Sequence, residues 1–404
     1  MTKRARGLIR VLFVALLVAS SLQFAAPAQA KTFTVCSSGC DYTTIAAALQ
    51  DADDGDTIAI GEGSYAGSFE VSKDITLSGA GHDTTTILGT NRASVIRVRS
   101  GANVTIETLT ITGGGGSRIG ANAIGGGGIL NEGRLTVKDS VVRDNTVATS
   151  GSRVRLGGGI YSETSKTLGI FDSVIAGNRA QRGGGIFIGD GDVVIEGTTI
   201  SGNQSGGDGG GIAHEGSETL RIERSDIRVN RSDRLGGGIA TTSELLLVDS
   251  TVVGNTAAGG GGITGGNKLL KVVRSTVGEN AASGAGIGLG GGITVGRGGL
   301  SLVDSIVENN QGLLGAGIFT NFATGDVDLI GSTVARNVAA ADGGGIWNQS
   351  AEINLSNSRV IDNQAGESGG GIFVRAPGAE VKLRNGSVVA GNQPDQCFPA
   401  DLKC

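Results

Sequence analysis

Ten copies of one short pattern run through most of this chain. Each copy reads [Ser/Thr]-x-[Val/Ile]-x-x-Asn, and the asparagines recur at a mean spacing of about 27 residues. A second pattern, Gly-[Gly/Ala]-Gly-Ile, accompanies every copy. A fixed period of this length is the sequence signature of a solenoid, in which each repeat stacks on its neighbours. The ten asparagines are Asn145, Asn178, Asn203, Asn230, Asn255, Asn280, Asn310, Asn337, Asn363 and Asn392.

The segments between the two patterns predict strands. Leu135-x-Val137 and Leu300-x-Leu302 alternate apolar with other residues, and no i, i+3, i+4 spacing accompanies them. Leucine-rich repeats have a similar period, but they set Asn within a leucine-rich frame and use a helical turn. Glycine is abundant, at 74 of 404 residues, whereas there are only 4 prolines, as expected for strands joined by tight turns. We therefore predict an all-β, single-stranded, right-handed parallel β-helix.

The recurrent polar residues fit a structural role in such a stack. Coils sit about 4.8 Å apart, so equivalent side chains line up from coil to coil. An inward Asn can donate its amide to the Asn of the next coil and accept backbone N–H groups at the turn. The Ser/Thr positions can form a similar ladder at the neighbouring corner. We assign both ladders and the glycine turns to the scaffold.

The first thirty residues have the pattern of a secretory leader. Four basic residues precede an apolar run from Val11 to Ala19, and Ala28-Gln29-Ala30 gives a small-x-small cleavage site. The apolar run is shorter than a bilayer requires, although a retained anchor is the alternative. We expect a signal peptide at 1–30 and a single β-helix domain at 31–404. Within that domain we expect the N-terminal cap and first coils at 31–112, ten repeat coils at 113–392 and a C-terminal cap at 393–404.

Helical spacing occurs once, near the start of this domain. Ile45, Ala48, Leu49 and Ala52 lie three or four residues apart, with Thr44 as a candidate N-cap and Gly55 after the expected end. Such a helix would cover the open end of the core, as solenoids require.

Charge and cysteine content narrow the partners and the compartment. The leader holds four of the 33 basic residues, so the remaining chain is acidic and nucleic acid is not an expected partner. Two close cysteine pairs, Cys36 with Cys40 and Cys397 with Cys404, predict local disulfides in an exported protein. Zinc is the alternative for four cysteines, but the pairs lie far apart in sequence and neither has a neighbouring histidine. No further membrane span is expected.

Several segments resemble a known family. Asp41-Tyr42-Thr43-Thr44-Ile45, Asp54-Gly55-Asp56-Thr57-Ile58 and Ile75-Thr76-Leu77-Ser78-Gly79-Ala80-Gly81 are similar to the N-terminal section of bacterial pectin-lyase-like β-helix proteins. The Gly-Gly-Gly-Ile coils resemble those of bacterial surface β-helix proteins, including choice-of-anchor repeat proteins and the chlamydial polymorphic outer-membrane proteins. The resemblance implies the β-helix fold, which serves lyases, hydrolases, epimerases and adhesins alike.

Residues suited to acid–base catalysis are few. The weak candidates are His214, the only repeat position with histidine, together with Arg221, Arg224 and Arg228. We interpret His214 as a solvated turn residue and the arginines as a solvated face. Arg224 also belongs to a column that alternates in sign with Asp249 and Arg274, which favours ion pairs between coils. No cofactor or metal is predicted, because the Asp-Gly segments near Asp190 and Asp208 do not continue as a Ca²⁺-binding array.

The residue after each repeat isoleucine is the remaining candidate site. If the isoleucines point inward, these residues point outward. The column contains five aromatics: Tyr161, Phe187, Phe319, Trp347 and Phe373. An exposed aromatic ladder suits sugar stacking or protein contact, whereas packing under a neighbouring loop is the alternative.

From these features we predict an exported surface or extracellular protein without enzymatic activity. It would bind a polysaccharide, another cell-envelope component or a protein partner along its side. The alternative is a polysaccharide lyase or epimerase acting on an acidic polysaccharide. The pattern makes no prediction of oligomeric state.

Overall fold

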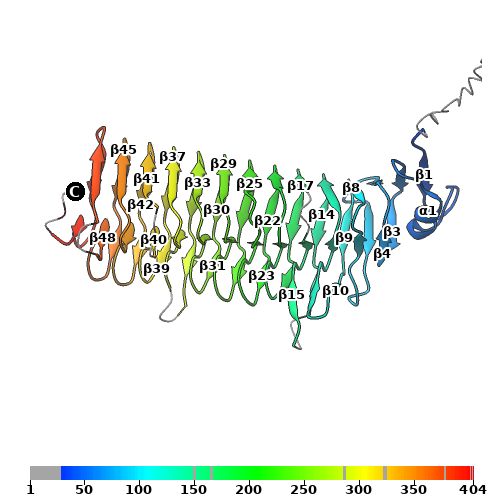
Figure 1. Cartoon of the computed structure of the whole chain (residues 1–404), viewed down its shortest axis with the longest axis horizontal. Coiled ribbons are helices and arrows are strands. Elements are labelled where there is room, and N and C mark those ends of the chain that lie inside the picture. Colours follow the sequence, from blue (N-terminus) through cyan, green and yellow to red (C-terminus); the bar gives the residue numbers. More distant parts are fainter. Residues whose placement is uncertain are drawn as a thin grey trace, which may run out of the picture.

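The chain folds into one elongated stack of coils, described here from a computed structural model (Figure 1). The structure describes residues 29–148, 152–163, 167–284, 288–321, 325–376, 379–400, 402 and 404. Residues 1–28 of the expected signal peptide lie outside the described part of the chain.

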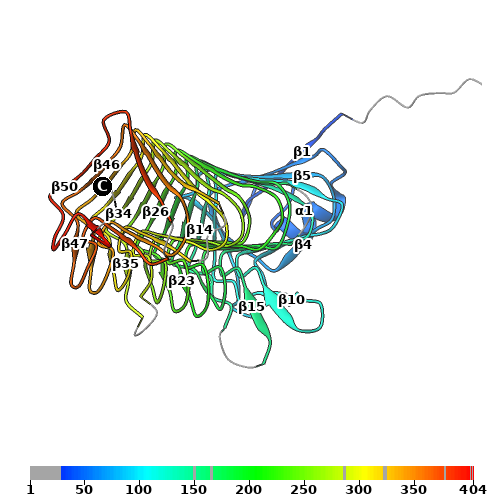
Figure 2. The ribbon, with the colours of Figure 1, turned by 60° about the vertical axis from the view of Figure 1, so that its left-hand side comes forward.

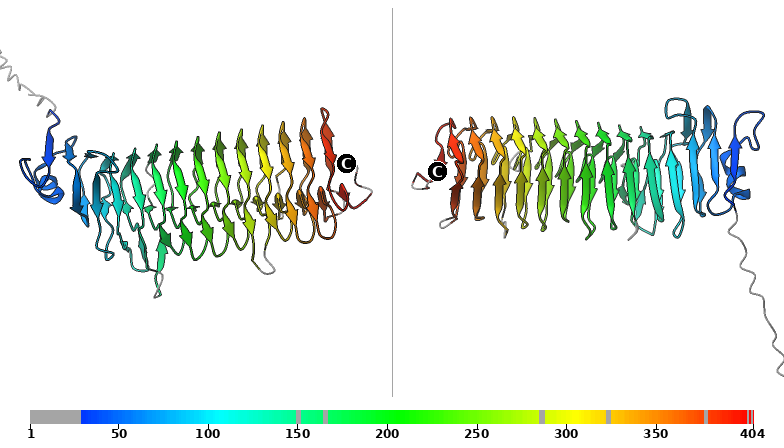
Figure 3. Two further views of the ribbon diagram at one scale, coloured as in Figure 1. Left: turned by 180° about the vertical axis from the view of Figure 1, so that it is seen from behind. Right: turned by 90° about the horizontal axis from the view of Figure 1, so that it is seen from above.

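Three long parallel sheets form the walls of the stack (Figure 3). Sheet A has 14 strands, from β1 (Thr32–Val35) to β49 (Val381–Arg384), and sheet B has 13, from β3 (Gly63–Ala66) to β50 (Val388–Ala390). Sheet C also has 13 strands. They are β4 (Phe69–Val71), β7 (Ile96–Val98), β12 (Ile129–Asn131), β16 (Ile160–Ser162), β20 (Ile186–Ile188), β24 (Ile212–His214), β28 (Ile239–Thr241), β32 (Ile263–Gly265), β36 (Ile293–Val295), β40 (Ile318–Thr320), β44 (Ile346–Asn348), β48 (Ile372–Val374) and β51 (Cys397–Phe398).

One coil shows the path of the chain. It runs from β24 on sheet C to β25 (Leu220–Glu223) on sheet A and β26 (Asp226–Arg228) on sheet B, then returns to sheet C at β28. Before that return it forms β27 (Arg231–Ser232), part of an eight-stranded sheet E of two-residue strands. The sequence does not reveal sheet E, because two residues are too few to show alternation.

Alternation along each strand builds the core. The isoleucines of sheet C stack in register, as Ile186 pairs with Ile212 and Ile212 with Ile239, and all three are fully buried. Buried Leu, Val and Ile from sheets A and B complete one continuous cluster along the stack. The predicted inward and outward faces are therefore confirmed for the repeat strands.

Both predicted polar ladders are present. The Asn255 Oδ1 atom accepts hydrogen bonds from the backbone N–H of Asn230 (2.9 Å) and from Asn230 Nδ2 (3.0 Å). Asn255 Nδ2 in turn donates to the Ile227 carbonyl (2.9 Å) and to Asn280 Oδ1 (3.0 Å). The serines repeat this pattern at the other corner, where Ser250 Oγ accepts the Ser225 N–H (3.1 Å). The ladders thus satisfy buried polar groups that would otherwise be costly.

The three glycines of each turn have two different roles. The first lies in the left-handed region, for example Gly209 at φ 70°. The third has no room for a side chain, since a Cβ on Gly211 would lie 2.7 Å from the Gly238 carbonyl oxygen of the next coil. Positive φ explains the first glycine, whereas close stacking of coils explains the third.

The predicted helix is present near the N-terminal end of the stack. Helix α1 (Ile45–Asp51) has Thr44 as its N-cap, whose hydroxyl accepts the Ala47 N–H (3.2 Å), and it buries Ile45 and Ala48. It ends at Asp51, since Ala52 has extended backbone, and Gly55 (φ 90°) lies after the end of the helix as expected. A capping function for α1 stays a prediction.

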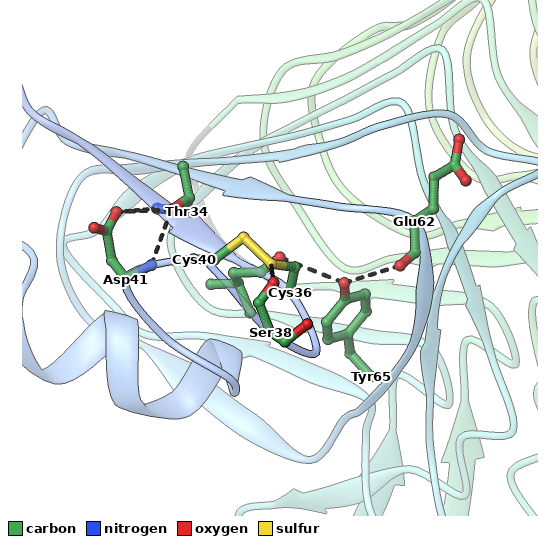
Figure 4. The surroundings of a disulfide bond; sticks show 8 residues. Thr34, Cys36, Ser38, Cys40, Asp41, Glu62 and Tyr65 are labelled. Atoms are coloured by element: carbon green, nitrogen blue, oxygen red, sulfur yellow. Dashed lines mark hydrogen bonds between the residues drawn. A yellow bond between two sulfur atoms is a disulfide. The ribbon is translucent and has the colours of Figure 1, made fainter.

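Both predicted disulfides are formed. Cys36–Cys40 lies beside α1, where the Tyr65 hydroxyl donates to the carbonyls of Val35 and Glu62 (Figure 4). Cys397–Cys404 joins β51 to the last residue of the chain. Across the described residues, no helix has the length and apolarity needed to cross a membrane.

An extension that the sequence did not predict projects from the stack (Figure 2). Strands β10 (Ser117–Ile119) and β11 (Ala123–Gly125) form an antiparallel hairpin, and β15 (Val154–Leu156) pairs with β11 in parallel. We call these three strands sheet D.

Candidate functional site

The residues that follow the repeat isoleucines form one column on the outer side of sheet C, and we call it the outer column. Its members are Leu130, Tyr161, Phe187, Ala213, Ala240, Thr264, Thr294, Phe319, Trp347 and Phe373. They pair in register from coil to coil, as Phe187 does with Ala213 and Thr294 with Phe319. Part of the column forms an apolar cluster of its own, separate from the main core.

The aromatic members of the column stack on one another. Tyr161 and Phe187 are 5.6 Å apart between ring centroids and nearly parallel, and Phe319 and Trp347 are 4.6 Å apart. Trp347 stacks in turn on Phe373, with 6.0 Å between centroids. These ring distances are typical of favourable aromatic contacts.

The expectation that these aromatics face solvent is wrong. Tyr161, Phe187, Phe319 and Trp347 are only 2–4% exposed, and Phe373 is half-buried. Ile119, Ala123 and Leu156 of sheet D pack against the cluster that contains Tyr161 and Phe187. Burial and an interaction with Glu163 both raise the pKa of Tyr161. The alternative, packing under a neighbouring segment, therefore describes this part of the column.

A second column overhangs the first. It consists of the residue before each glycine turn, and neighbouring members such as Leu156 and Arg182 form a bridge between coils. Leu156 covers the Tyr161 cluster, and the Arg182 guanidinium lies over the Phe187 ring at 5.6 Å from its centroid. We call this the rim column; Asp208 and Leu235 are its next members.

A pocket opens where the outer column becomes small. Between Phe187 and Phe319 the column holds Ala213, Ala240, Thr264 and Thr294. The pocket has a volume of about 200 Å³. Its lining residues are Arg182, Asp208, Ala213, His214, Glu215, Leu235, Ala240, Thr241, Thr242, Thr264, Gly265 and Gly266. We call it the outer-column pocket; small side chains form its floor and rim residues form one wall.

Charged side chains surround this apolar floor. Arg182 forms an ion pair with Glu215 and so links the two sides of the pocket at its Phe187 end. Burial lowers the pKa of Arg182, with Asp208 acting in the opposite direction. Asp208 Oδ2 lies 3.7 Å from Nη1 of Arg234. The side chains of Arg182, Asp208 and Glu215 are 20–32% exposed, so these charges interact in a partly desolvated setting.

Two buried oxygen atoms of the pocket lack partners. Asp208 Oδ1 and Thr264 Oγ1 are buried and accept or donate no hydrogen bond within the described part of the chain. Most buried polar atoms in proteins have a partner. Both atoms are covered by the protein itself, so they lie behind the pocket surface and not on it.

His214 is buried in sheet C, not in a solvated turn as predicted. It ends β24 and is 1% exposed, in register with Ile188 and Thr241 of the adjacent coils. Its Nδ1 atom lies 3.2 Å from Thr241 Oγ1. Burial lowers its pKa to about 4, despite the opposing charge of Asp190. The strand alternation directs this imidazole to the face opposite Ala213, while residue 214 also borders the pocket.

The three candidate arginines are dispersed over other faces. Arg221 is on sheet A and pairs with Glu223, and Arg228 is on sheet B, with its Nε 2.7 Å from Asp226 Oδ2. Arg224 lies at the corner between them and pairs with Glu196. The structure does not bring these residues together with His214.

In the column that alternates in sign, the predicted ion pair between coils forms between Arg274 and Asp249. Arg274 binds Asp249 with Nε–Oδ1 and Nη2–Oδ2 distances of 2.7 Å each, and this contact lowers the pKa of Asp249. Among the described residues, no cluster of three or more His, Cys, Asp or Glu side chains is placed to hold a metal ion.

Sequence reasoning missed Arg182, Asp208 and Glu215. The signal that could have found Arg182 and Asp208 is the rim column, since each member directly precedes a glycine turn. Glu215 follows His214 at the end of β24 and belongs to neither column. The interruption of the aromatic outer column by four small residues marks the same coils.

Comparison with known proteins agrees with this architecture. A sequence profile described as the right-handed beta helix region matches residues 129–297. No curated protein matches the chain in sequence.

Solved structures with similar folds include three proteins named for polysaccharide chemistry. The mannuronan C-5 epimerase AlgE6 A-module of Azotobacter vinelandii has a TM-score of 0.44 at 13% identity, covering 86% of this chain and 94% of that one. The pectin methylesterase PemA of Erwinia chrysanthemi has a TM-score of 0.34 at 12% identity, covering 66% and 88%. The pectate lyase Pel9A has a TM-score of 0.32 at 13% identity, covering 90% and 82%. At these scores none of the three bears on the chemistry of this chain.

The stacked parallel sheets, the asparagine ladder and the profile match together define the class of protein. The chain is a right-handed parallel β-helix protein.

Proposed function

We propose that this protein binds a glycan in the outer-column pocket without altering it chemically, and that it acts outside the cell. The observation that carries the proposal is the pocket itself. It combines an apolar floor, an Arg182 side chain that lies over an aromatic ring, and the partly exposed carboxylate side chains of Asp208 and Glu215. Ligand sites typically combine a mainly apolar surface with a few placed polar groups.

Two further features support the proposal. The leader-like residues 1–30 and the two disulfides suit an exported protein, because disulfides persist in oxidising compartments. A lyase or epimerase would need an available base, whereas His214 is buried and Arg182 is paired with Glu215.

Filling the pocket tests the proposal. Ala240→Trp should abolish binding to an array of neutral, N-acetylated, sulfated and uronate oligosaccharides, because the indole would occupy the pocket floor. Aromatics already occupy this column in other coils, so the melting temperature should change little. Thr294→Phe is the matched control, since Thr294 belongs to the same column but does not line the pocket.

Three results would contradict the proposal. These are failure of the folded protein to bind any glycan, equal binding by Ala240→Trp and the parent, and release of unsaturated products detected by ultraviolet absorbance. The last result would instead favour the lyase alternative.

A further inference from the structure

Four apolar residues lie in register on the outer face of sheet A. They are Val248, Val273, Val303 and Ile330, which pair from coil to coil. The three valines are partly exposed, and Ile330 is 47% exposed. The coils on either side hold Glu223 and Ser356 at this position, so the apolar run is limited to four coils. A single exposed valine is ordinary, whereas a contiguous exposed apolar patch marks an interaction site. We call these four residues the apolar stripe.

A column of corner residues borders the apolar stripe, where the chain turns from sheet A to sheet B. Each follows a stripe residue directly: Asp249, Arg274, Asp304 and Gly331. Arg274 binds Asp249 through Nε and Nη2, so its Nη1 atom makes no hydrogen bond within the described part of the chain. Asp304 is exposed and adds only a longer-range attraction to Arg274, without an ion pair among the described residues. Both groups can therefore bind an opposite charge from outside the chain.

The order of these charges determines how a second copy can lie against this face. In a two-fold pair with parallel axes, a charge on this column meets the same charge of the other copy. In an antiparallel pair the column is reversed, so Arg274 of each copy meets Asp304 of the other. Two-fold contacts are self-complementary, and opposite charges across an interface fix its register while like charges penalise the alternative. The alternation of charge therefore favours the antiparallel pair.

The apolar stripe fits the same register. When Arg274 lies opposite Asp304, the four stripe residues of one copy cover the four of the other in reverse order. Glu223 then lies beside Ser356 of the second copy, so no like charges meet at the ends of the stripe. Burial of apolar area on both copies supplies the attraction, and the charged pairs supply the orientation.

We infer that the apolar stripe and its corner column bind a second copy of this chain, antiparallel to the first. Four coils at 4.8 Å each give a contact only about 19 Å long. Interfaces at the small end of the range belong to weak or transient complexes, so the dimer should dissociate on dilution. This surface is separate from the outer-column pocket on sheet C, so the inference does not depend on the proposed function.

Sedimentation velocity across a dilution series tests the contact. The parent should show a monomer–dimer equilibrium that salt weakens, because the charged pairs lie at the surface. Asp304→Arg should weaken dimerisation by at least about tenfold, since two attractive pairs become repulsive. This variant should fold, because Arg224 and Arg274 occupy the same corner position at φ 44°. Val303→Lys should weaken dimerisation in the same way, and Lys138 already occupies this position in an earlier coil.

Asp172→Arg is the matched control, because Asp172 is a corner residue (φ 47°) that lies outside the stripe. It should dimerise as the parent does, and so should Ala240→Trp, which alters only the pocket. A parent that stays monomeric at every concentration would overturn the inference. Dimerisation of the folded Asp304→Arg and Val303→Lys variants at the strength of the parent would overturn it as well.

Chemical crosslinking tests the orientation. Val248→Cys and Ile330→Cys each add one thiol to a chain whose four cysteines form the two disulfides. With a short bismaleimide, a mixture of the two variants should give crosslinked dimers, because these positions face each other in the antiparallel pair. Each variant alone should give few, since its two thiols are then three coils apart, about 14 Å along the axis. Efficient crosslinking of either variant alone, but not between the two, would show a parallel pair and refute the arrangement.

Discussion

At the scale of single residues, His214 shows how a coil position sets the chemistry of a side chain. Its place is taken by Ile188 in one neighbouring coil and by Thr241 in the other. Burial lowers its pKa from the ordinary 6.5 to about 4, so the imidazole is neutral near pH 7. It can therefore pack against its neighbours, but it favours unfolding when acid protonates it.

We predict that His214 makes the stability of the protein sensitive to acid. Because the folded-state pKa is lower than the unfolded one, the unfolded state binds more protons, and stability falls as the pH drops from about 6.5 to 4. The loss approaches about 3 kcal/mol, since each unit of pKa is worth about 1.4 kcal/mol. In His214→Ile, which copies Ile188, melting temperature should fall less over this range. Identical pH profiles of the parent and the variant would refute the prediction.

At the scale of structural elements, the asparagine ladder ends in a residue of a different type. Gln396 Oε1 accepts from the backbone N–H of Asn392 (3.1 Å) and from Asn392 Nδ2 (2.9 Å). It thereby takes the place that the next asparagine would have in a longer stack. The C-terminal segment thus satisfies the last rung of the ladder.

We predict that Gln396→Leu weakens the last coil. The substitution leaves two donors of Asn392 without this acceptor, which costs about 1–3 kcal/mol where such groups are buried. Hydrogen exchange should accelerate in strands β49 and β50, while strands in the middle of the stack keep their protection. Gln364→Leu is the control, because Gln364 is exposed and lies outside the ladder. Equal exchange in both variants would contradict the assigned role of Gln396.

The same elements show how far the sequence could predict the structure. The period revealed the stack, both ladders, the inward isoleucines and the outward direction of the aromatic column. It did not reveal that Tyr161 and Phe187 are covered, because alternation gives the side of a strand on which a residue lies and not what packs on that side. Cover comes from Leu156 and from the β10–β11 hairpin, whose irregular sequence contains no copy of either repeat pattern.

The candidate site was predicted only in part. The two aromatic groups and the small residues between them are visible in the sequence. The positions of Arg182 and Asp208 depend on how the chain folds back before each glycine turn. That geometry brings the rim column over the outer column, and neither column alone identifies a pocket.

At the scale of the whole molecule, each coil contacts mainly the coil before it and the coil after it. Strand β43 (Val338–Ala339), for example, pairs with β39 (Gln311–Gly312) on one side and β47 (Gln364–Ala365) on the other. Stability in such an array is approximately a sum of coil and interface contributions. Removing one whole coil should therefore leave the remaining interfaces intact.

We predict that deletion of residues 338–363 yields a shorter but folded protein. The cut joins Asn337 to Gln364, which is the register partner of Val338, so the asparagine ladder continues without a break. The β-rich circular dichroism spectrum should be retained, and glycan binding should persist because the outer-column pocket lies in earlier coils. Deletion of 338–350, half a coil, should abolish cooperative unfolding, because it removes β43 and β44 but keeps the strands of sheets A and B from the same coil. The chain can then no longer follow the path of the stack in register. Equal behaviour of the two deletions would count against this view of the stack.

The asparagine ladder also aligns a row of side-chain amide dipoles along the long axis of the stack. From Asn145 to Asn363 each side-chain amide donates one N–H to the asparagine oxygen of the following coil. Each of these oxygens in turn accepts from the preceding coil. Aligned amide dipoles add and polarise one another, as peptide units do along a helix. The row therefore begins at an oxygen, which accepts the Gly114 N–H, and finishes at a donor, which Gln396 receives. The two ends of the stack consequently differ in polarity, and a further coil added at either end must present the matching group.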